Sequence, residues 1–416
     1  MEKKADRDQI RRQNRGIILA ALRRSQSIAR VDLGRETKLS PATVTSITSD
    51  LIDEKLIIQL VEPDLKQAGS RGRPRTFLTL NPDAARIAGI KISVNKIELL
   101  LADYQGNILG SEQFSIRTDT ASSEHFAGQL VELLKSFCRS RGTDPKQLVE
   151  IGVASQGVVN SRQGTIVWSP AFSEPDIQIT KPIQDALGIH CSLSNDSNMI
   201  AQALHWKEPD RFSGTFIVIF VDYGVGCGLY IDNELFTGDT GAASEIGHAN
   251  HIPGGNLCRC GKLGCLEAYL GDYALMRSAL NLDGQHSPGD VRVTREEIRA
   301  IADKARSGDA ELAEVFRKAG EALGYGIARL LATLDPSRVA ITGAGAQEFD
   351  LMESGMQSAL NDALVEDLRQ HAQIEVRPWQ EDIILAGTIA RTLQRLDSIV
   401  FAAARNRAKV TEKEGV

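Results

Sequence analysis

The most informative part of this sequence consists of two neighbouring stretches, Glu245-Ile246-Gly247-His248 and Cys258-Arg259-Cys260-Gly261-Lys262-Leu263-Gly264-Cys265-Leu266-Glu267. Together they place one histidine and three cysteines within about twenty residues. Imidazole nitrogen and thiolate sulfur are the ligands of closed, tetrahedral structural zinc sites, which leave no open position for a reacting water. The spacing therefore predicts a structural zinc ion (Zn2+) with four ligands: His248, Cys258, Cys260 and Cys265.

The C-x-C-G-x-x-G-C spacing resembles the signature of the ROK family, which contains sugar kinases and sugar-responsive repressors. In that family a zinc site lies against a sugar pocket, and two carboxylates, here Glu245 and Glu267, bracket the metal ligands. The match to Glu-x-Gly-His selects His248 as the histidine ligand. His251, three residues further on, is the second choice.

The composition is that of a soluble globular protein, with 416 residues, 42% hydrophobic residues and 25% charged residues. This length is enough for two or three domains. No apolar run approaches the roughly 20 residues of a membrane helix, and Met1 to Arg15 lacks the apolar core of a signal peptide. We therefore expect a cytoplasmic protein without a membrane partner. Six cysteines in such a chain do not indicate a disulfide framework.

The net charge of −6 is unevenly distributed along the chain. Residues 1–80 hold 16 Lys and Arg against 10 Asp and Glu, whereas the remainder holds 32 against 44. A basic end on an acidic body suggests that this end contacts nucleic acid. The alternative is a solvated basic tail, and charge alone does not separate the two.

Three helices are predicted in the basic segment. The first covers Gln13–Arg24, the second begins at a Ser27 cap and reaches Lys38, and the third runs to about Glu54 with Ser40 as its cap and Pro41 in its first turn. Apolar residues at helical spacing define the buried faces, in chain order Ile17, Ile18, Ala21, Leu22, Ile28, Val31, Leu33, Val44, Ile47 and Leu51.

The opposite face of the third helix is small and mostly hydroxylated, whereas a solvent-facing helix would normally carry Lys and Glu. Such a face fits the major groove of DNA, which is about 12 Å wide. We therefore predict a recognition helix that contacts double-stranded operator DNA through Ser40, Ala42, Thr43, Thr45, Ser46 and Ser49.

Two short strands, at 56–61 and 75–80, follow the third helix and complete a winged helix-turn-helix pattern. Between them lies an Arg-Gly-Arg-Pro-Arg run whose flat cationic side chains fit a narrow minor groove. This predicts DNA contacts from Arg71, Arg73 and Arg75. The alternative is a flexible linker with incidental arginines. Basic residues of the first helix are expected on phosphates rather than bases, namely Arg11, Arg12 and Arg15.

The body of the chain shows two strand-rich halves. Three antiparallel strands are predicted at 87–94, 97–102 and 108–116, and a similar set follows at 215–221, 226–231 and 234–237. These halves resemble the duplicated, two-lobed actin-like (ribonuclease H-like) fold of sugar kinases. The fold class is therefore α/β, with a winged helix-turn-helix domain and its linker at 1–82, the ROK sugar-binding domain at 83–400 and a charged tail at 401–416.

The resemblance also implies a sugar site in the cleft between the lobes. Asn195 and Asp196 match the family's Asn-Asp motif, in which the aspartate of the kinases takes the proton of the sugar hydroxyl. Helix capping is the alternative role of this pair. The implied sugar contacts are Asn195, Asp196, Glu245, His248 and Glu267.

Other cleft motifs are open to two interpretations. The 222–228 stretch, Asp-Tyr-Gly-Val-Gly-Cys-Gly, resembles the second phosphate turn of the kinases, but a glycine-rich hairpin without a ligand is the favoured interpretation. Gln156 stands where the family has a proline. Trp168 and Phe172 fit either stacking on a sugar face or core packing.

One stretch separates a kinase from a repressor. The kinases carry Asp-x-Gly-Gly-Thr-Lys after the first strand of the body, and here the corresponding residues are Lys91, Ile92, Ser93, Val94, Asn95 and Lys96. The carboxylate that would hold magnesium is missing, and side chains replace both glycines, so phosphoryl transfer is not expected.

We therefore predict a non-catalytic, sugar-responsive DNA-binding transcription regulator, a repressor of carbohydrate metabolism genes. Binding to a two-fold operator implies a homodimer or a homotetramer. Two alternatives stay open. One is an active ROK-type sugar kinase with an accessory DNA-binding domain, and the other is a DNA-binding protein whose cleft has become a protein-docking surface.

Overall fold

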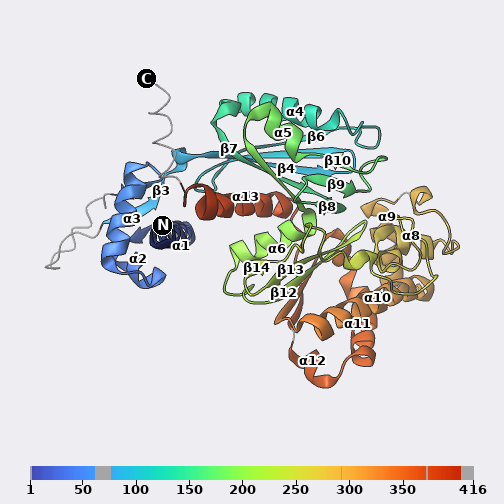
Figure 1. Cartoon of the computed structure of the whole chain (residues 1–416). Helices are drawn as coiled ribbons and strands as arrows, with labels where there is room; N and C mark the ends of the chain where they lie inside the picture. The colour runs from blue at the N-terminus through green and yellow to red at the C-terminus, as the bar shows by residue number, and fades with distance from the viewer. Residues whose placement is uncertain (1, 61–75, 292, 372, 404–416) are drawn as a thin grey trace.

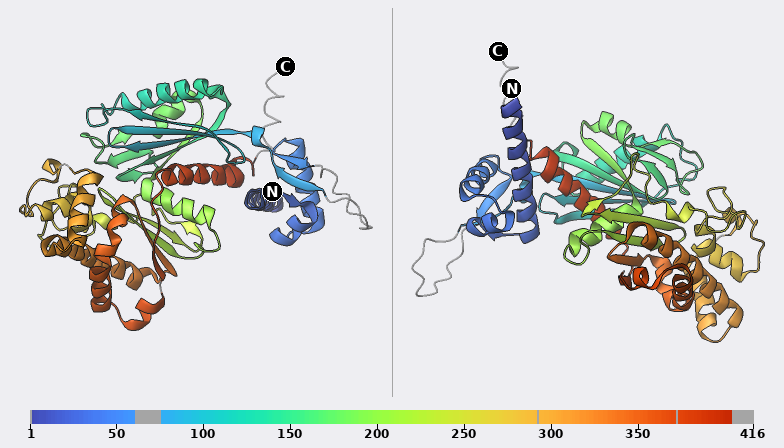
Figure 2. Two further views of the ribbon diagram at one scale, coloured as in Figure 1. Left: turned by 180° about the vertical axis from the view of Figure 1, so that it is seen from behind. Right: turned by 60° about the horizontal axis from the view of Figure 1, so that its bottom comes forward.

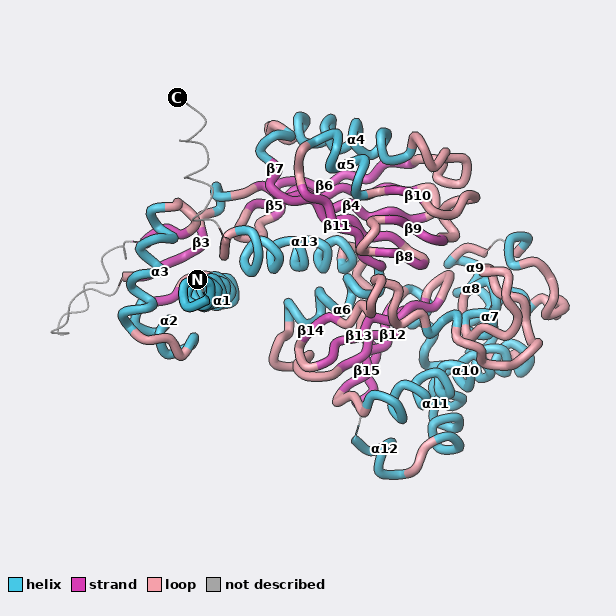
Figure 3. Tube along the Cα trace, in the orientation of Figure 1, coloured by secondary structure: helices cyan, strands magenta, loops and turns pink. Residues whose placement is uncertain are grey.

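The computed structural model describes residues 2–60, 76–291, 293–371 and 373–403, and the side chains of the first helix from Asp8 onward. Within these residues the chain forms an N-terminal helical unit and a two-lobed body (Figures 1 and 3). None of the described helices is both long enough and apolar enough to cross a lipid bilayer.

The N-terminal unit is a winged helix-turn-helix, with three helices and a three-stranded sheet in the order β1-β3-β2. Its elements are α1 (Glu2–Ser25), β1 (Ile28–Ala29), α2 (Arg30–Thr37), α3 (Pro41–Asp53), β2 (Ile57–Leu60) and β3 (Phe77–Leu80). The third helix begins as predicted, because Ser40 Oγ accepts a hydrogen bond from the Thr43 amide at 3.2 Å and Pro41 occupies the first turn.

Three details of the predicted helical unit were wrong. Ser27 does not cap the second helix, because residues 28–29 first pair with β3 and Ala29 then takes the capping position. Val31 is 56% exposed and Ile17 is 43% exposed, although both were predicted to be buried. The other residues of the three predicted seams are buried, except Ile28, which is half-buried.

The two lobes of the body contain sheets of the same topology, β6-β5-β4-β7-β11 and β14-β13-β12-β15-β16. Each starts with three antiparallel strands and adds two parallel strands. The first sheet consists of β4 (Arg86–Ser93), β5 (Lys96–Asp103), β6 (Ile108–Ser115), β7 (Leu148–Ser155) and β11 (His190–Asn195). The second consists of β12 (Phe216–Val221), β13 (Val225–Ile231), β14 (Glu234–Leu235), β15 (Arg338–Thr342) and β16 (Gln373–Val376).

Helices cover both sheets, and a small sheet flanks the first lobe. The first lobe carries α4 (Phe126–Ser140), α5 (Thr180–Leu187), β8 (Val158–Asn160), β9 (Thr165–Trp168) and β10 (Ile177–Gln178). The second carries α7 (Glu267–Leu270), α8 (Asp272–Ala279), α9 (Arg295–Arg306), α10 (Ala310–Leu334), α11 (Phe349–Ala363) and α12 (Glu366–His371). Between the lobes lie α6 (Asp196–Lys207) and α13 (Ile383–Arg395) (Figure 1).

The two central helices cross at close range. A Cβ added to Gly387 of α13 would lie 1.8 Å from the carbonyl oxygen of Met199 in α6, so only glycine permits this crossing. After α13 the chain forms a π-helical turn, Leu396–Val400, which packs against α1 of the N-terminal unit. One hydrophobic cluster accordingly joins side chains of α1, α3, the first sheet and α13.

A buried ion pair reinforces this junction. The Arg23 guanidinium of α1 donates to both oxygens of Asp397, at 2.6 and 2.9 Å, and the Tyr104 hydroxyl donates to the same carboxylate at 2.7 Å. Each of these three side chains is no more than 5% exposed. The N-terminal unit is therefore joined to the body by a packed interface and not by the chain alone (Figure 2).

Candidate functional site

A cavity of about 560 Å³ opens between the two lobes. The turn after β4, the ends of β11 and β12, and the loop around Glu245 all contribute to its wall. The predicted site residues Asn195, Asp196, Glu245, His248 and Glu267 all line it. The sequence thus located the residues of one cavity although they are spread over more than seventy positions.

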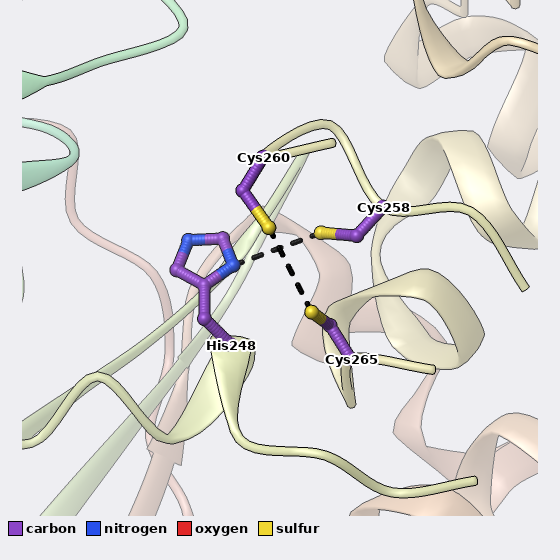
Figure 4. Close-up of side chains that lie close together, drawn as sticks. All are labelled: His248, Cys258, Cys260 and Cys265. Carbon is purple, nitrogen blue, oxygen red and sulfur yellow. Dashed lines mark hydrogen bonds between the residues drawn. The ribbon is translucent and has the colours of Figure 1, made fainter. Parts of the chain in front are cut away.

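His248 and the three cysteines form a compact cluster, and their ligand atoms all lie within 4.8 Å of one another (Figure 4). His248 Nδ1 lies 3.6 Å from Cys258 Sγ, and Cys260 Sγ lies 3.7 Å from Cys265 Sγ. Ligands bound tetrahedrally to zinc at the usual bond lengths are separated by roughly 3.5 to 3.8 Å. The four side chains therefore fit a tetrahedral metal ion.

His251 does not belong to this cluster. Its ring instead packs against Tyr269, with the ring centroids 5.2 Å apart. Nδ1 of His248 faces the cysteines, and the same side chain lines the cavity. Nε2 is therefore the ring nitrogen that a ligand in the cavity could use. Trp168 contacts this imidazole edge-on at 5.4 Å and also lines the cavity, whereas Phe172 packs in the core against Phe126.

Asn195 has a structural role at the start of α6. Its Oδ1 accepts the Ser197 amide at 2.8 Å, and its Nδ2 donates to the Gly157 carbonyl at 2.9 Å. Asp196 uses one oxygen, Oδ1, for the Ser197 amide and hydroxyl. Among the described residues Asp196 Oδ2 has no hydrogen-bond partner, so Asp196 can still accept from a ligand.

Three carboxyl groups in the cavity hold protons unusually tightly. Burial raises the pKa of Asp196 to about 6 and that of Glu245 to about 7. Burial, together with the nearby Asp272, raises the pKa of Asp222 to about 6. Strongly perturbed acids that converge on a cavity are typical of binding and catalytic sites.

Glu245 and Glu267 differ in the number of hydrogen bonds that their carboxylates already accept within the protein. The structure gives Glu245 no hydrogen bond or ion pair to another described residue, so its oxygens are available. Glu267 is 3% exposed and receives the Val225 amide at 3.1 Å, Arg259 Nε at 3.2 Å and the Tyr273 hydroxyl at 3.4 Å. Glu267 therefore anchors the wall between the metal cluster and β13.

Arg259 is a site residue that the sequence reasoning missed. Its side chain is 12% exposed, lines the cavity and stacks over Tyr223, with 4.4 Å between the guanidinium carbon and the ring centre. The only available signal was its place between Cys258 and Cys260, two members of the His/Cys cluster, which keeps it close to whatever the cluster borders.

The turn after β4 is occupied by an ion-pair network. Lys91 Nζ lies 2.8 Å from one Glu98 oxygen, and Lys96 Nζ lies 3.2 Å from the other. Ser93 and Val94 also line the cavity. Lys91, paired with Glu98, therefore stands where the kinase pattern requires a magnesium-binding carboxylate, and Ser93 and Val94 stand at its two glycines.

The predicted DNA-contacting face of α3 is accessible in part. Thr43 is half-buried. The other five residues are exposed, namely Ser40, Ala42, Thr45, Ser46 and Ser49. The predicted contacts from Arg71, Arg73 and Arg75 lie outside the described residues.

The predicted phosphate role of Arg15 was wrong. This side chain is 2% exposed, donates to Glu54 and to the Phe401 carbonyl, and thereby ties α1 to α3 and to the C-terminal turn. Arg11 is paired with Asp50, whereas Arg12 is exposed.

Comparisons with known proteins agree with this architecture. The ROK family model matches residues 87–391. A xylose repressor of Caldicellulosiruptor bescii is 24% identical over 385 residues, covering 91% of this chain and 95% of the relative. The DNA-binding transcriptional dual regulator NagC of Escherichia coli is 24% identical over 367 residues, covering 88% and 89% of the two chains.

Two solved structures show the same fold. A ROK family transcriptional regulator, a homolog of the E. coli MLC protein, superposes with a TM-score of 0.78 at 22% identity, covering 95% of this chain and 99% of that one. A ROK family glucokinase from Streptomyces griseus, in complex with glucose and AMPPNP, superposes with a TM-score of 0.58 at 23% identity. The match covers 74% of this chain and 100% of the glucokinase chain. The match of the ROK family model over residues 87–391 shows that the chain belongs to the ROK family.

Proposed function

We propose that this protein is a sugar-responsive transcription regulator, acting as a repressor in the cytoplasm. The observation that carries the proposal is a kinase-like body, with free acidic groups in its cavity, packed onto a helix-turn-helix unit. The relatives named as repressors support it, because the matched regions extend over nearly the whole chain. The proposed organisation is a DNA-binding domain at 1–82, a sugar-binding domain at 83–400 and a tail at 401–416.

The proposed sugar contacts follow from which polar atoms are still free. Glu245 and Asp196 Oδ2 would accept hydrogen bonds from hydroxyl groups, and His248 would donate from Nε2. Asn195 would donate from the second N–H of its Nδ2 while its Oδ1 caps α6, and Trp168 would cover an apolar sugar face. Glu267 would act on the ligand mainly by holding the wall.

The metal proposal is a structural zinc ion held by His248, Cys258, Cys260 and Cys265. Such an ion would cross-link the loop that carries Glu245 to the start of α7, and four protein ligands leave no position for a reacting water. Its effect on the sugar site would pass through Glu267, since Glu267 Oε1 lies 3.6 Å from Cys258 Sγ.

A route from the sugar to the DNA is built into the helices. The first residue of α6, Asp196, lines the sugar cavity, and α6 crosses α13, whose C-terminal extension packs on α1. A sugar that binds one lobe arrangement more tightly than another would therefore shift α1 and the attached α3. Contacts from α3 and from Arg71, Arg73 and Arg75 would hold operator DNA, with two or four copies of the chain on a two-fold site.

The second candidate function is an active sugar kinase. It is favoured by Asp196, whose raised pKa of about 6 suits a base that accepts a hydroxyl proton near neutral pH. The Lys91–Glu98–Lys96 network opposes it, because its one carboxylate is already paired with two lysines and is not free to bind magnesium.

The test is a thermal-shift screen of the metal-loaded protein against sugars and sugar phosphates, with and without Mg-ATP. A saturating ligand should raise stability by about 3 kcal/mol at a hundred times its dissociation constant. A shift from one sugar, without phosphorylated product, supports the regulator. Product formation from Mg-ATP would establish the kinase instead.

A further inference from the structure

A second cavity, of about 780 Å³, lies between the N-terminal unit and the body. Residues of α1, of the C-terminal half of α6 and of the π-helical turn after α13 form its walls. It shares no wall residue with the sugar cavity. Its volume falls in the range of small-molecule sites, about 300 to 1,000 Å³.

One buried polar group in this wall lacks a partner. Gln202 is 0% exposed, and its Oε1 accepts a hydrogen bond from the Tyr230 hydroxyl at 2.9 Å. Its Nε2 has no partner among the described residues. Reversing the amide would leave the carbonyl oxygen unpaired instead, so one polar atom is unsatisfied in either orientation. Such groups are rare in folded proteins and point to a missing partner.

A large apolar side chain lines the same cavity one helical turn after this amide. Trp206 follows Gln202 by four residues on the same face of α6, and helical side chains lean toward the preceding turn. Trp206 is 36% exposed, and Ile17 of α1, which lines the same cavity, is 43% exposed. The cavity therefore has two apolar walls, one from each part of the molecule.

The charge at the cavity is positive. Three arginines line it, Arg12, Arg23 and Arg24, with Asp397 as the one acidic group among its described wall residues. Arg23 is paired with Asp397, and Arg24 with Glu36 at 3.2 Å. Arg12 is exposed and makes no ion pair with the described part of the chain, so an anion would gain an available counter-charge.

We propose that this cavity is a second effector site, for a small carboxylate with an apolar body. Arg12 attracts the carboxylate, Trp206 and Ile17 cover the apolar body, and the Gln202 amide donates to one of its oxygens. Access to Gln202 requires the Trp206 side chain to turn aside, and such rotamer changes are common on binding. A bound molecule would bridge α1 and α6 and hold the DNA-binding unit against the body.

The test uses phenylacetate as the probe. Phenylacetamide is the counterpart without the charge, and acetate is the counterpart without the apolar ring. Saturation-transfer NMR on the full-length, metal-loaded protein measures each affinity. We expect phenylacetate to bind at least fivefold more tightly than either counterpart. Equal affinities for the three probes, or no transfer to any of them, would overturn the proposal.

Four variants locate the site. Gln202→Leu keeps the side-chain size but removes the amide, and Arg12→Gln removes the charge, so each should weaken phenylacetate binding at least fivefold. Gln129→Leu and Arg139→Gln, on the exposed face of α4, are the matched controls and should leave it unchanged. Thermal unfolding and metal content establish that each variant is folded. Wild-type affinity in both Gln202→Leu and Arg12→Gln would place the probe elsewhere and reject the site.

Discussion

The two lobes present equivalent hairpins to the same cavity, β4–β5 in the first and β12–β13 in the second, yet the two turns differ in chemistry. In the first, Lys91 and Lys96 close over Glu98. In the second, an acidic residue and glycines remain, with Asp222 at the end of β12. The backbone topology has thus been kept in both lobes while only one turn keeps the residues of a phosphate-binding turn.

The glycines of the second hairpin have a packing role of their own. A Cβ on Gly226 would lie 2.0 Å from Ser197 Oγ, and one on Gly228 would lie 2.4 Å from the Ser197 carbonyl oxygen, both in α6. A Cβ on Gly224 would meet Arg259 and Glu267 at 2.5 and 2.6 Å. Because α6 and the metal-bordering wall approach β13 so closely, these glycines are needed whether or not a phosphate binds. The comparison teaches that a turn resembling a phosphate-binding motif can require its glycines for packing alone.

The largest effect is expected from removing a metal ligand, which should disturb the second hairpin and spare the first. Cys260→Ser should lower the metal content and, since a structural site contributes several kcal/mol, lower Tm by more than about 5 °C. Metal analysis and calorimetry measure both. Cys138→Ala, in the first lobe, should keep its metal. A Cys260→Ser protein with full metal content and unchanged Tm would contradict the assignment.

The second prediction tests the packing role of the glycines. Gly228→Ala should cost about 2 to 3 kcal/mol, because the added methyl group meets the Ser197 carbonyl and Ala201 Cβ at 2.4 and 2.8 Å. Urea unfolding measures the cost. Gly128→Ala on α4 is the control, since nothing lies within 4 Å and a helix gains up to about 1 kcal/mol from the change. Equal stability of the two variants would show that α6 does not require this glycine.

The third prediction attempts to convert the first turn into the kinase pattern. Lys91→Asp combined with Ser93→Gly and Val94→Gly should tighten Mg-ATP binding at least tenfold over wild type, because it supplies a carboxylate for magnesium and room for phosphates. Isothermal titration calorimetry measures the affinity. Lys181→Asp, exposed on α5, should have no effect. If wild type already binds Mg-ATP as tightly as the triple variant, the ion-pair network does not prevent Mg-ATP binding.

The smallest effect concerns pH. Asp196 would accept hydrogen bonds from a sugar more strongly when it is ionised, and its pKa is raised to about 6. Sugar affinity should therefore fall several-fold from pH 7.5 to 5.5. The pKa of Asp196 in the folded protein exceeds its ordinary value near 4, so the folded state binds the proton more tightly than the unfolded state. Asp196 therefore contributes most to stability below about pH 4, and this contribution is lost as the pH rises through about 6.

Asp196→Asn separates this residue from its neighbours Glu245 and Asp222, whose pKa values are also raised. Its sugar affinity should vary less with pH than that of wild type. The same pH profile in both proteins would assign the titration to another group.

Much of the fold was predictable from local patterns. Alternating and continuous apolar runs located the two hairpins to within one or two residues, and the cap at Ser40 located α3. The position of α13 between the lobes was not predictable. Its apolar faces pack against β4, β7 and α6, which are distant in sequence, and no local pattern encodes such partners.

The candidate site divides in the same way. The sequence by itself determined the cluster of His248 with three cysteines and the lysine and side chains of the first turn, because both depend on residue identity at short spacing. Only the tertiary structure decided that Glu267 is already bonded, that Arg15 is buried against Glu54, and that the buried Gln202 Nε2 has no partner among the described residues. Whether a polar group is buried and hydrogen-bonded depends on segments that are distant in sequence. Those segments come together only in the folded chain, so local sequence patterns do not reveal these contacts.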